Sequence, residues 1–411
     1  MPLRFTTAGE SHGKALVALV EGLPAGVPVS AEWVDRDLLR RMQGYGRGAR
    51  MKIEQDRIEW LSGVRAGETL GSPVAMLIPN RDWANWEDVM AHEAADPGEL
   101  RRRRVTRPRP GHADLVGVLK YDRVDARDIL ERASARETTA RVAAGALARR
   151  LLDEFGVEIG SHVVSLGGVL VPRPAELPTP LNDAADRSEV RVLDRSVEPE
   201  IIRRIDAAKK AGDTLGGEVE VVARGVVVGL GSHVSWDRKL DGRLAGALMS
   251  IPAVKAVEIG LGVEAARRPG SAVHDPIDPS LPSGHGPPLA GDTRAGFRRR
   301  TNHAGGLEGG ITTGEPLVIR VAMKPISTLM SPLPTVDLAT GQPANAQSER
   351  SDVTAVPALG VIAEALTAIT LADAMLEKFG GDSLAEMRRN YDGYLAALGA
   401  RWAALRESAP D

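Results

Sequence analysis

The stretch Glu218-Val219-Glu220-Val221 opens residues 218–228, EVEVVARGVVV, and it decides the fold class. Its first four residues alternate charged and apolar side chains, which is typical of a strand with one buried and one solvated face. The strands of a parallel sheet covered on both faces would be continuously apolar. Further strand signals occur at residues 3–7, 57–61, 74–79, 157–171, 254–259 and 317–323. We therefore predict an α+β fold in which antiparallel sheets pack on helices.

Helices are expected between these strands. Ser30 fits an N-cap for a helix over residues 31–42, and Gly44 follows as a stop signal. Ser134-x-x-Glu137 fits a capping box that opens a longer helix through residue 155. Other helices are predicted at residues 198–211, 237–249, 361–379 and 384–406.

The weakly polar segment 355–376 is the one stretch that resembles a membrane span, and it contains Glu364 and Asp373. An acidic side chain at the bilayer centre costs roughly 2.5–3.5 kcal/mol, so we predict a buried core helix instead. The N-terminal sequence MPLRFTTAGESHG lacks the apolar core of a secretory signal. We expect a cytoplasmic protein that does not enter a membrane.

Composition narrows the possible functions. The 411 residues are 43% hydrophobic, which is enough for a large core. The formal net charge of −3 argues against a dedicated nucleic-acid binder, and an aromatic content of 3% leaves few rings on which bases could stack. The absence of cysteine excludes disulfides and thiolate chemistry, and the eight histidines lack the spacing of a metal site.

Two long stretches, residues 80–113 and 267–296, show no regular pattern, and the second is dense in proline and glycine. Loops of this length in a compact protein usually serve as functional lids or are disordered. No linker-like segment divides the chain. We therefore predict one domain over residues 1–411, with active-site loops near 80–113 and 267–296.

The first candidate motif is Gly9-Glu10-Ser11-His12-Gly13, directly after a predicted strand. Glycines on both sides of a Ser-His pair allow a tight turn and close approach of a ligand. The motif also matches the nucleophile pattern G-x-S-x-G, although the triad partners are undetermined. A structural role for His12 stays open on this evidence.

Arginines mark three further motifs. Residues 101–114 contain Arg101–Arg104 and then Thr106-Arg107-Pro108-Arg109-Pro110-Gly111-His112, where proline and glycine hold Arg107 and His112. Guanidinium groups offer bidentate contacts to phosphate or carboxylate, which favours a functional role for Arg107 and His112. For residues 101–104 a solvated basic loop is the favoured interpretation. Residues 44–50, GYGRGAR, suit an anion cradle, and residues 132–137, RASARE, place backbone N–H groups at a helix start.

The last motifs lie in the C-terminal half. The run AGGLEGG at residues 304–310 permits a planar ligand to lie against the backbone. Lys324, Ser327 and Thr328 could hold the phosphate of such a ligand, and Arg350-Ser351-Asp352 follows. None of these motifs is specific when taken alone.

Together these segments resemble the chorismate synthase family. The resemblance covers GESHG, GYGRGARMKIEQD, RPGHAD, RASARET, AGGLEGG, KPIST, RSD and KFGGDS, in this order from Gly9 to Ser383. It implies a redox-neutral 1,4-anti elimination of phosphate from 5-enolpyruvylshikimate-3-phosphate (EPSP), with reduced FMN as the cofactor. It also implies a helical layer between antiparallel sheets, in a homotetramer.

The resemblance implies roles for particular residues. His12 would serve the leaving phosphate, His112 would act on the reduced flavin, Asp352 with Ser134 would assist proton removal, and Ser11 would orient these groups. The implied flavin contacts are Arg132, Ala133, Ser134, Pro252, Ala253, Gly309, Lys324, Pro325, Ile326, Ser327, Thr328 and Arg350. The candidates for binding the anionic substrate are Arg41, Arg47, Arg50, Arg107 and Arg136, and the first two match positions sometimes assigned to NADP.

Two positions depart from the family pattern. Pro252 stands where a side-chain amide is expected, and His303 replaces an expected Arg or Asn. The large insertions associated with members that reduce their own flavin are absent, so we expect a separate flavin reductase, with NADPH acting only as an indirect reductant.

Two other functions stay open at this stage. One is a flavin oxidoreductase that consumes NADPH. The other is an anion- or RNA-binding protein that uses residues 101–109, whose binding would weaken with salt.

Overall fold

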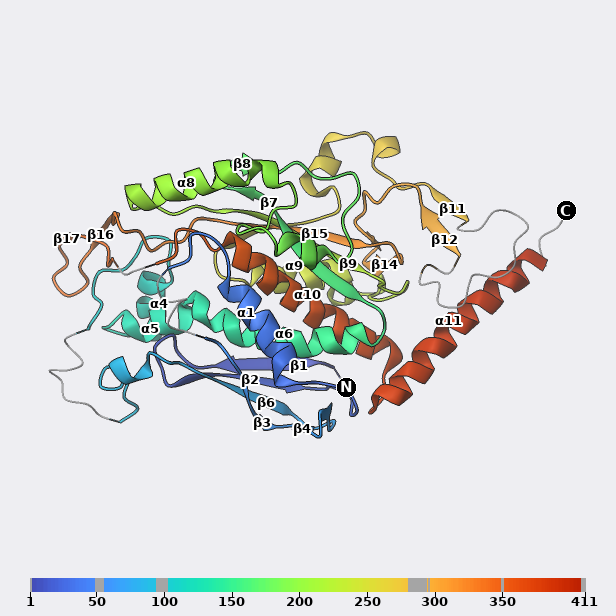
Figure 1. Cartoon of the computed structure of the whole chain (residues 1–411), viewed down its shortest axis with the longest axis horizontal. Coiled ribbons are helices and arrows are strands. Elements are labelled where there is room, and N and C mark those ends of the chain that lie inside the picture. Colours follow the sequence, from blue (N-terminus) through green and yellow to red (C-terminus); the bar gives the residue numbers. More distant parts are fainter. Residues whose placement is uncertain are drawn as a thin grey trace.

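The computed structural model describes residues 2–48, 55–93, 103–279, 294, 296–348 and 351–407. It contains two larger antiparallel sheets (Figure 1). The first has the strand order β1–β2–β6–β3, with β1 at Arg4–Ala8, β2 at Ala15–Glu21, β6 at Val74–Pro79 and β3 at Glu59–Ser62. The second has the order β10–β15–β9–β7–β8, with β10 at Val254–Ile259, β15 at Leu317–Met323, β9 at Gly217–Arg224, β7 at Glu158–Leu166 and β8 at Val169–Leu170.

Short hairpins complete the β structure. They pair β4 (Val64–Arg65) with β5 (Glu68–Thr69), β11 (Ile277–Pro279) with β12 (Phe297–Arg299), β13 (Leu307–Glu308) with β14 (Ile311–Thr312), and β16 (Pro334–Val336) with β17 (Pro343–Asn345). The predicted α+β class with antiparallel sheets is confirmed.

Helices α6 (Thr138–Asp153) and α10 (Val356–Phe379) pack against each other and lie between the two larger sheets in Figure 1. Helix α6 contacts β1 and β2 of the first sheet, whereas α10 contacts β7 and β9 of the second. The remaining helices are α1 (Ala31–Met42), α4 (Asp114–Tyr121), α5 (Arg127–Ala133), α7 (Leu181–Ala185), α8 (Glu198–Ala211), α9 (Leu240–Met249) and α11 (Leu384–Glu407).

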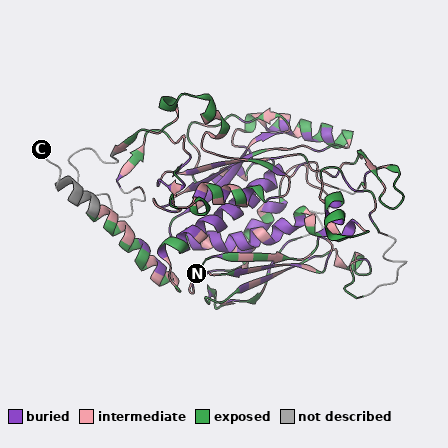
Figure 2. Ribbon diagram, turned by 180° about the vertical axis from the view of Figure 1, so that it is seen from behind, coloured by how far each residue is buried: buried purple, intermediate pink, exposed green. Residues whose placement is uncertain are grey.

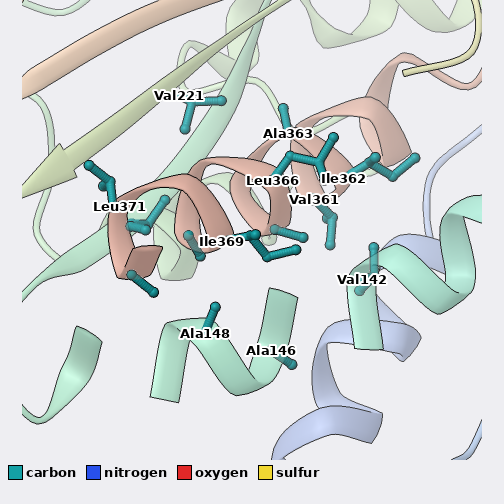
Figure 3. Packing of buried hydrophobic residues seen from close by; sticks show 14 of the residues in the cluster. Val142, Ala146, Ala148, Val221, Val361, Ile362, Ala363, Leu366, Ile369 and Leu371 are labelled. Atoms are coloured by element: carbon teal, nitrogen blue, oxygen red, sulfur yellow. The ribbon is translucent and has the colours of Figure 1, made fainter. Parts of the chain in front are cut away.

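The apolar character of α10 is explained by its place in the core. All of its residues are buried except Asp373, Glu377 and Lys378, although the helix is long and apolar enough to cross a membrane by composition alone. Figure 2 shows buried residues concentrated in the central helices, and Figure 3 shows α6 and α10 meeting through small and branched apolar side chains. A Cβ on Gly145 would lie 2.4 Å from the Cβ of Ala365, so only glycine allows this approach.

Residues 218–224 of the stretch 218–228 lie in β9, and this strand differs from expectation in one respect. Glu218 is exposed as predicted, but Glu220 on the same face is only 4% exposed. It receives hydrogen bonds from His162 and Arg173, which compensate the burial of its charge. The strand ends at Arg224 because Gly225 adopts a φ of 73°.

Several local predictions were wrong. Strand β2 was not predicted, and neither were helices α4 and α5. The expected strand 157–171 is a hairpin, because Gly167 and Gly168 both take the positive φ that a tight two-residue turn requires. The capping box at Ser134 does not form: the Ser134 hydroxyl accepts from the N–H of Arg136, and Glu137 bonds Thr7 and Arg141 instead.

Candidate active site

Three arginines that are far apart in sequence gather around two carboxylates. Arg136 donates to Asp56 at 2.5 Å, Arg41 lies 3.9 Å from the same carboxylate, and Arg47 forms a 3.2 Å ion pair with Asp352. Guanidinium groups gathered as in this arginine cluster can bind an anion through charge-assisted hydrogen bonds.

Arg41 is a member of the arginine cluster with an unused donor among the described residues. It is 4% exposed, and it donates to Thr138 and to the carbonyl of Ala135. Its Nη1 makes no hydrogen bond to any described residue. Burial, together with the charges of Arg47 and Arg136, lowers the pKa of Arg41 to about 9. A buried guanidinium with an unused donor can bind an anion.

His12 lies beside this cluster in the turn between β1 and β2. Its Nδ1 is 2.9 and 3.0 Å from the two oxygens of Glu131, and its ring stacks on Trp86 at a centroid distance of 3.8 Å. Burial alone would raise the pKa of Glu131, but the hydrogen bonds and charges of His12 and Arg127 outweigh it and lower that pKa. The geometry holds the imidazole ring in one plane.

The two serines of the prediction meet next to His12. The Ser134 hydroxyl lies 3.2 Å from that of Ser11, and the backbone N–H of Ser11 donates to the carbonyl of Glu131. Asn80 connects this turn to the arginine cluster, because its amide nitrogen donates to the carbonyl of Gly13 while its oxygen accepts from Arg136.

A second histidine is held by the opposite loop. His112 Nδ1 lies 2.5 Å from Asp114, a fully buried carboxylate that also accepts from the Arg109 side chain. Burial would raise the pKa of Asp114, but the hydrogen bonds from His112 and Arg109 lower it far below its ordinary value. Arg109 also donates to the hydroxyl of Thr328 at 2.8 Å.

The segment 324–328 follows the end of β15 and adjoins this loop. Lys324 Nζ donates to the carbonyl of Gly111, and its backbone N–H donates to the carbonyl of Ala253. The Lys324 ammonium has two further N–H groups, and the Thr328 hydroxyl can still donate its own proton. Lys324, Thr328 and Arg109 together form a cationic end that suits a phosphate group.

A cavity of about 780 Å³ borders part of the arginine cluster and Thr328 of the cationic end. Its lining residues do not include His12, Arg41, Arg136, His112 or Lys324. Its walls include Arg47, Gly48 and Asp352 from the arginine cluster and Thr328 from the cationic end. The Asp352 carboxylate accepts from the N–H of Gly48 at 2.6 Å, which holds the 44–48 loop at the cavity. A cavity of this size can hold a cofactor and a small substrate together.

Comparison with known proteins identifies the family. A family model described as chorismate synthase matches residues 3–376. The chorismate synthase of Geobacter metallireducens is 56% identical over 399 residues, or 96% of this chain and 99% of the relative, and that of Trichlorobacter lovleyi is 58% identical over 400 residues, with the same two shares. A chorismate synthase crystal structure with 43% sequence identity gives a TM-score of 0.76 and covers 97% of this chain and 99% of that one. This chain belongs to the chorismate synthase family.

Membership of the chorismate synthase family makes the protein a carbon–oxygen lyase of the shikimate pathway, which leads to the aromatic amino acids. The structure also argues against a free basic loop for polynucleotides. Arg103 stacks on Trp86, Arg104 donates to the carbonyl of Val124, and Arg109 is buried. Arg101 and Arg102 lie outside the described residues.

Of the described residues implied by the chorismate synthase resemblance, Arg47, Thr328 and Asp352 line the cavity. Arg107 is exposed and donates to Gln347 at 3.4 Å, whereas Arg109, which the prediction passed over, is buried among His112, Asp114 and Thr328. The Pro-x-Pro-Gly spacing around Arg109 was the available signal, since rigid flanking residues favour an ordered side chain. Arg50 and Arg350 lie outside the described residues.

The predicted flavin contacts also separate into groups. Arg132 donates to the carbonyls of Thr7 and Gly9, and Pro252–Ala253 lies beside Lys324. Gly309 lies in the β13–β14 turn, before the start of β15, whereas Lys324 follows its end. The seven residues of β15 span roughly 20 Å, so one protomer does not bring Gly309 to the cationic end.

His303 belongs to the same distant end of the second sheet as Gly309. Its carbonyl accepts from Leu261, beyond the end of β10, and its ring lies 3.2 Å from the carbonyl of Val273. The backbone N–H of His303 donates to Asp275. These contacts give His303 a structural place within the protomer.

Proposed function

We propose that this protein converts EPSP to chorismate and phosphate. The C–O bond to phosphate and one C–H bond of the ring break, a ring double bond forms, and phosphate and a proton leave without net redox change. The observation that carries this proposal is the buried guanidinium of Arg41, whose Nη1 makes no hydrogen bond to a described residue. EPSP carries two carboxylates and a phosphate, so it can accept charge-assisted hydrogen bonds from such a group.

Within this proposal, His12 gives a proton to the departing phosphate, because a neutralised phosphate is a better leaving group. Ser11 and Ser134 orient the substrate next to the imidazole, and Asp352 assists removal of the ring proton. Arg109 takes the anion-binding place first expected for Arg107.

The residues also fit a flavin phosphate. Lys324, Ser327 and Thr328, with Arg109 behind them, would hold the phosphate of FMN, and the backbone near Ala253 and the ring of His112 would border the rest of the cofactor. When bound, reduced FMN supplies transient electron density to the breaking C–O bond. His112 is kept with Nδ1 toward Asp114, so its Nε2 is the nitrogen available to the cofactor.

Several wider features belong to the same proposal. The chain acts as one domain of the family's β-α-β sandwich, in a cytoplasmic homotetramer. A separate flavin reductase supplies the reduced cofactor, and NADPH takes part only through that reductase.

An anaerobic assay tests the proposal. Purified protein is mixed with EPSP and either dithionite-reduced or oxidised FMN, and chorismate absorbance and phosphate release are followed. We expect product only with reduced FMN, over many turnovers per flavin and without net flavin oxidation. Folded, FMN-binding protein that forms no product in either mixture would refute the proposal.

A further inference from the structure

Glu131 is a buried carboxylate to which the proposed reaction gives no role. It lies in α5 with 2% of its surface exposed. Both of its oxygens accept hydrogen bonds: Oε2 from the backbone N–H of His12 at 2.9 Å, and Oε1 from Arg127 at 2.8 Å. The Nδ1 of His12 faces both oxygens at nearly equal distances.

This arrangement determines which imidazole nitrogen carries a proton. An ionised carboxylate only accepts hydrogen bonds, so Nδ1 of His12 must carry a hydrogen when it faces Glu131. Proton transfer to a ligand then falls to Nε2. Trp86 stacks on the same ring with an interplanar angle of 23°, and Arg103 lies over Trp86 at 4.1 Å, so the ring plane is also fixed from the solvent side.

We propose that Glu131 is a positioning residue that accepts from Nδ1–H of His12 and turns Nε2 toward the leaving phosphate. The proton given to the phosphate is then the second proton of the imidazolium, carried on Nε2. The proposal rests on the proposed function, because it needs His12 to act in the elimination. Glu131 itself does not contact the substrate in this proposal and acts only through His12.

Two substitutions distinguish positioning from plain structural support. Glu131→Gln keeps the size of the side chain but presents an NH2 group, and either orientation sets a donor against Arg127 or against the N–H of His12. Glu131→Asp shortens the side chain but keeps an acceptor-only carboxylate. A positioning role therefore predicts that the Asp variant retains more kcat than the Gln variant, whereas a purely steric role predicts the reverse order.

The expected effect lies in kcat. Loss of the partner that orients a functional imidazole typically costs about 10- to 100-fold, so we expect this fall in kcat for Glu131→Gln, with KM for EPSP and FMN affinity within about threefold of wild type. In a His12→Ala background the same substitution should have no further effect, because the group that it positions is gone.

A second buried Glu–His pair supplies a matched control. Glu220 on β9 accepts from His162 at 3.4 Å, and both side chains are buried away from the cavity-lining residues. Glu220→Gln should affect thermal stability as much as Glu131→Gln but leave kcat unchanged.

The possible outcomes distinguish the role of His12 in the reaction from the positioning role of Glu131. Near-wild-type turnover in His12→Ala would overturn the role of His12 in the proposed function. If His12→Ala is inactive, three results would overturn the positioning role alone. These are an unchanged kcat in Glu131→Gln, a higher kcat in the Gln variant than in the Asp variant, and additive losses in the double variant.

Discussion

Arg40 and Arg41 are neighbours on α1, yet burial acts on them in opposite ways. Arg40 donates to Glu364 and Asp186, and these carboxylates raise its pKa well above the ordinary value although burial alone would lower it. Arg41 faces the arginine cluster, where burial and neighbouring guanidiniums lower its pKa to about 9. Both side chains are largely buried, so burial alone does not distinguish a structural arginine from a binding one.

The difference lies in how Arg40 and Arg41 are partnered. Around Glu364, three arginines are matched by three carboxylates, and this balanced cluster consists of Arg40, Arg149, Arg191, Asp37, Asp186 and Glu364. Ser161 and Asn182 add hydrogen bonds to Glu364. In the arginine cluster, by contrast, Arg41 keeps an Nη1 donor that makes no hydrogen bond to a described residue. A cluster whose charges are matched stabilises the fold, whereas an unused buried donor can bind an anion.

The largest effect is expected from Glu364→Ala. This change leaves Arg40, Arg149 and Arg191 buried without their shared carboxylate, which typically costs 3–5 kcal/mol. Urea denaturation should show this fall in the free energy of unfolding. A loss below about 1 kcal/mol would mean that the balanced cluster does not stabilise the fold.

Arg41→Met should reduce activity without reducing the free energy of unfolding. The free energy of unfolding should stay constant or rise, because a poorly compensated buried charge is replaced by an apolar side chain of similar length. Loss of a charge-assisted contact of about 2–3 kcal/mol should reduce kcat/KM for EPSP roughly 30- to 150-fold. Arg40→Met is the matched control, since it should destabilise the fold while folded molecules keep their kcat.

The acid side of the stability profile gives a third test. Burial would raise the pKa of Glu364, but Arg40, Arg149 and Arg191 lower it well below 4.5. The unfolded chain therefore takes up this proton first as the pH falls below about 4.5, and the stabilisation by Glu364 is lost on further acidification. Relative to Glu364→Gln, the wild-type protein should lose up to about 1.4 kcal/mol more per pH unit in this range. Parallel profiles in urea titrations would contradict the prediction.

The smallest effect is expected from Asp186→Asn at the edge of the balanced cluster. The Asp186 side chain is 26% exposed, and Arg40 and Arg191 both keep Glu364 as a partner. Partly exposed ion pairs contribute about 1 kcal/mol or less. Urea denaturation should show a fall in the free energy of unfolding within this limit. A fall as large as that of Glu364→Ala would contradict the prediction, because Asp186 would then stabilise the fold as much as Glu364.

Local signals predicted much of the framework correctly. The Ser30 N-cap, the end of α8 at Gly212 and the burial of segment 355–376 all follow from neighbouring residues, and the structure confirms each of them. Strand β2 escaped prediction because ALVALVE is a short apolar run, and such runs do not distinguish a strand from a buried helix segment. The motifs of the candidate site pointed to the right loops but not to every side chain within them.

The amino-acid sequence by itself determined the α+β class, the core helix and the family, because these depend on local patterns and on motifs in a given order. Only the tertiary structure decided which arginines join the arginine cluster. Arg40 and Arg41 differ by one position, and about 100° of helix rotation sends one to the balanced cluster and the other to the site. The same holds for the exposed Arg107 and the buried Arg109. Arg40 is paired with Glu364, which the chain brings from a distant segment, and that pairing exists only once the chain has folded.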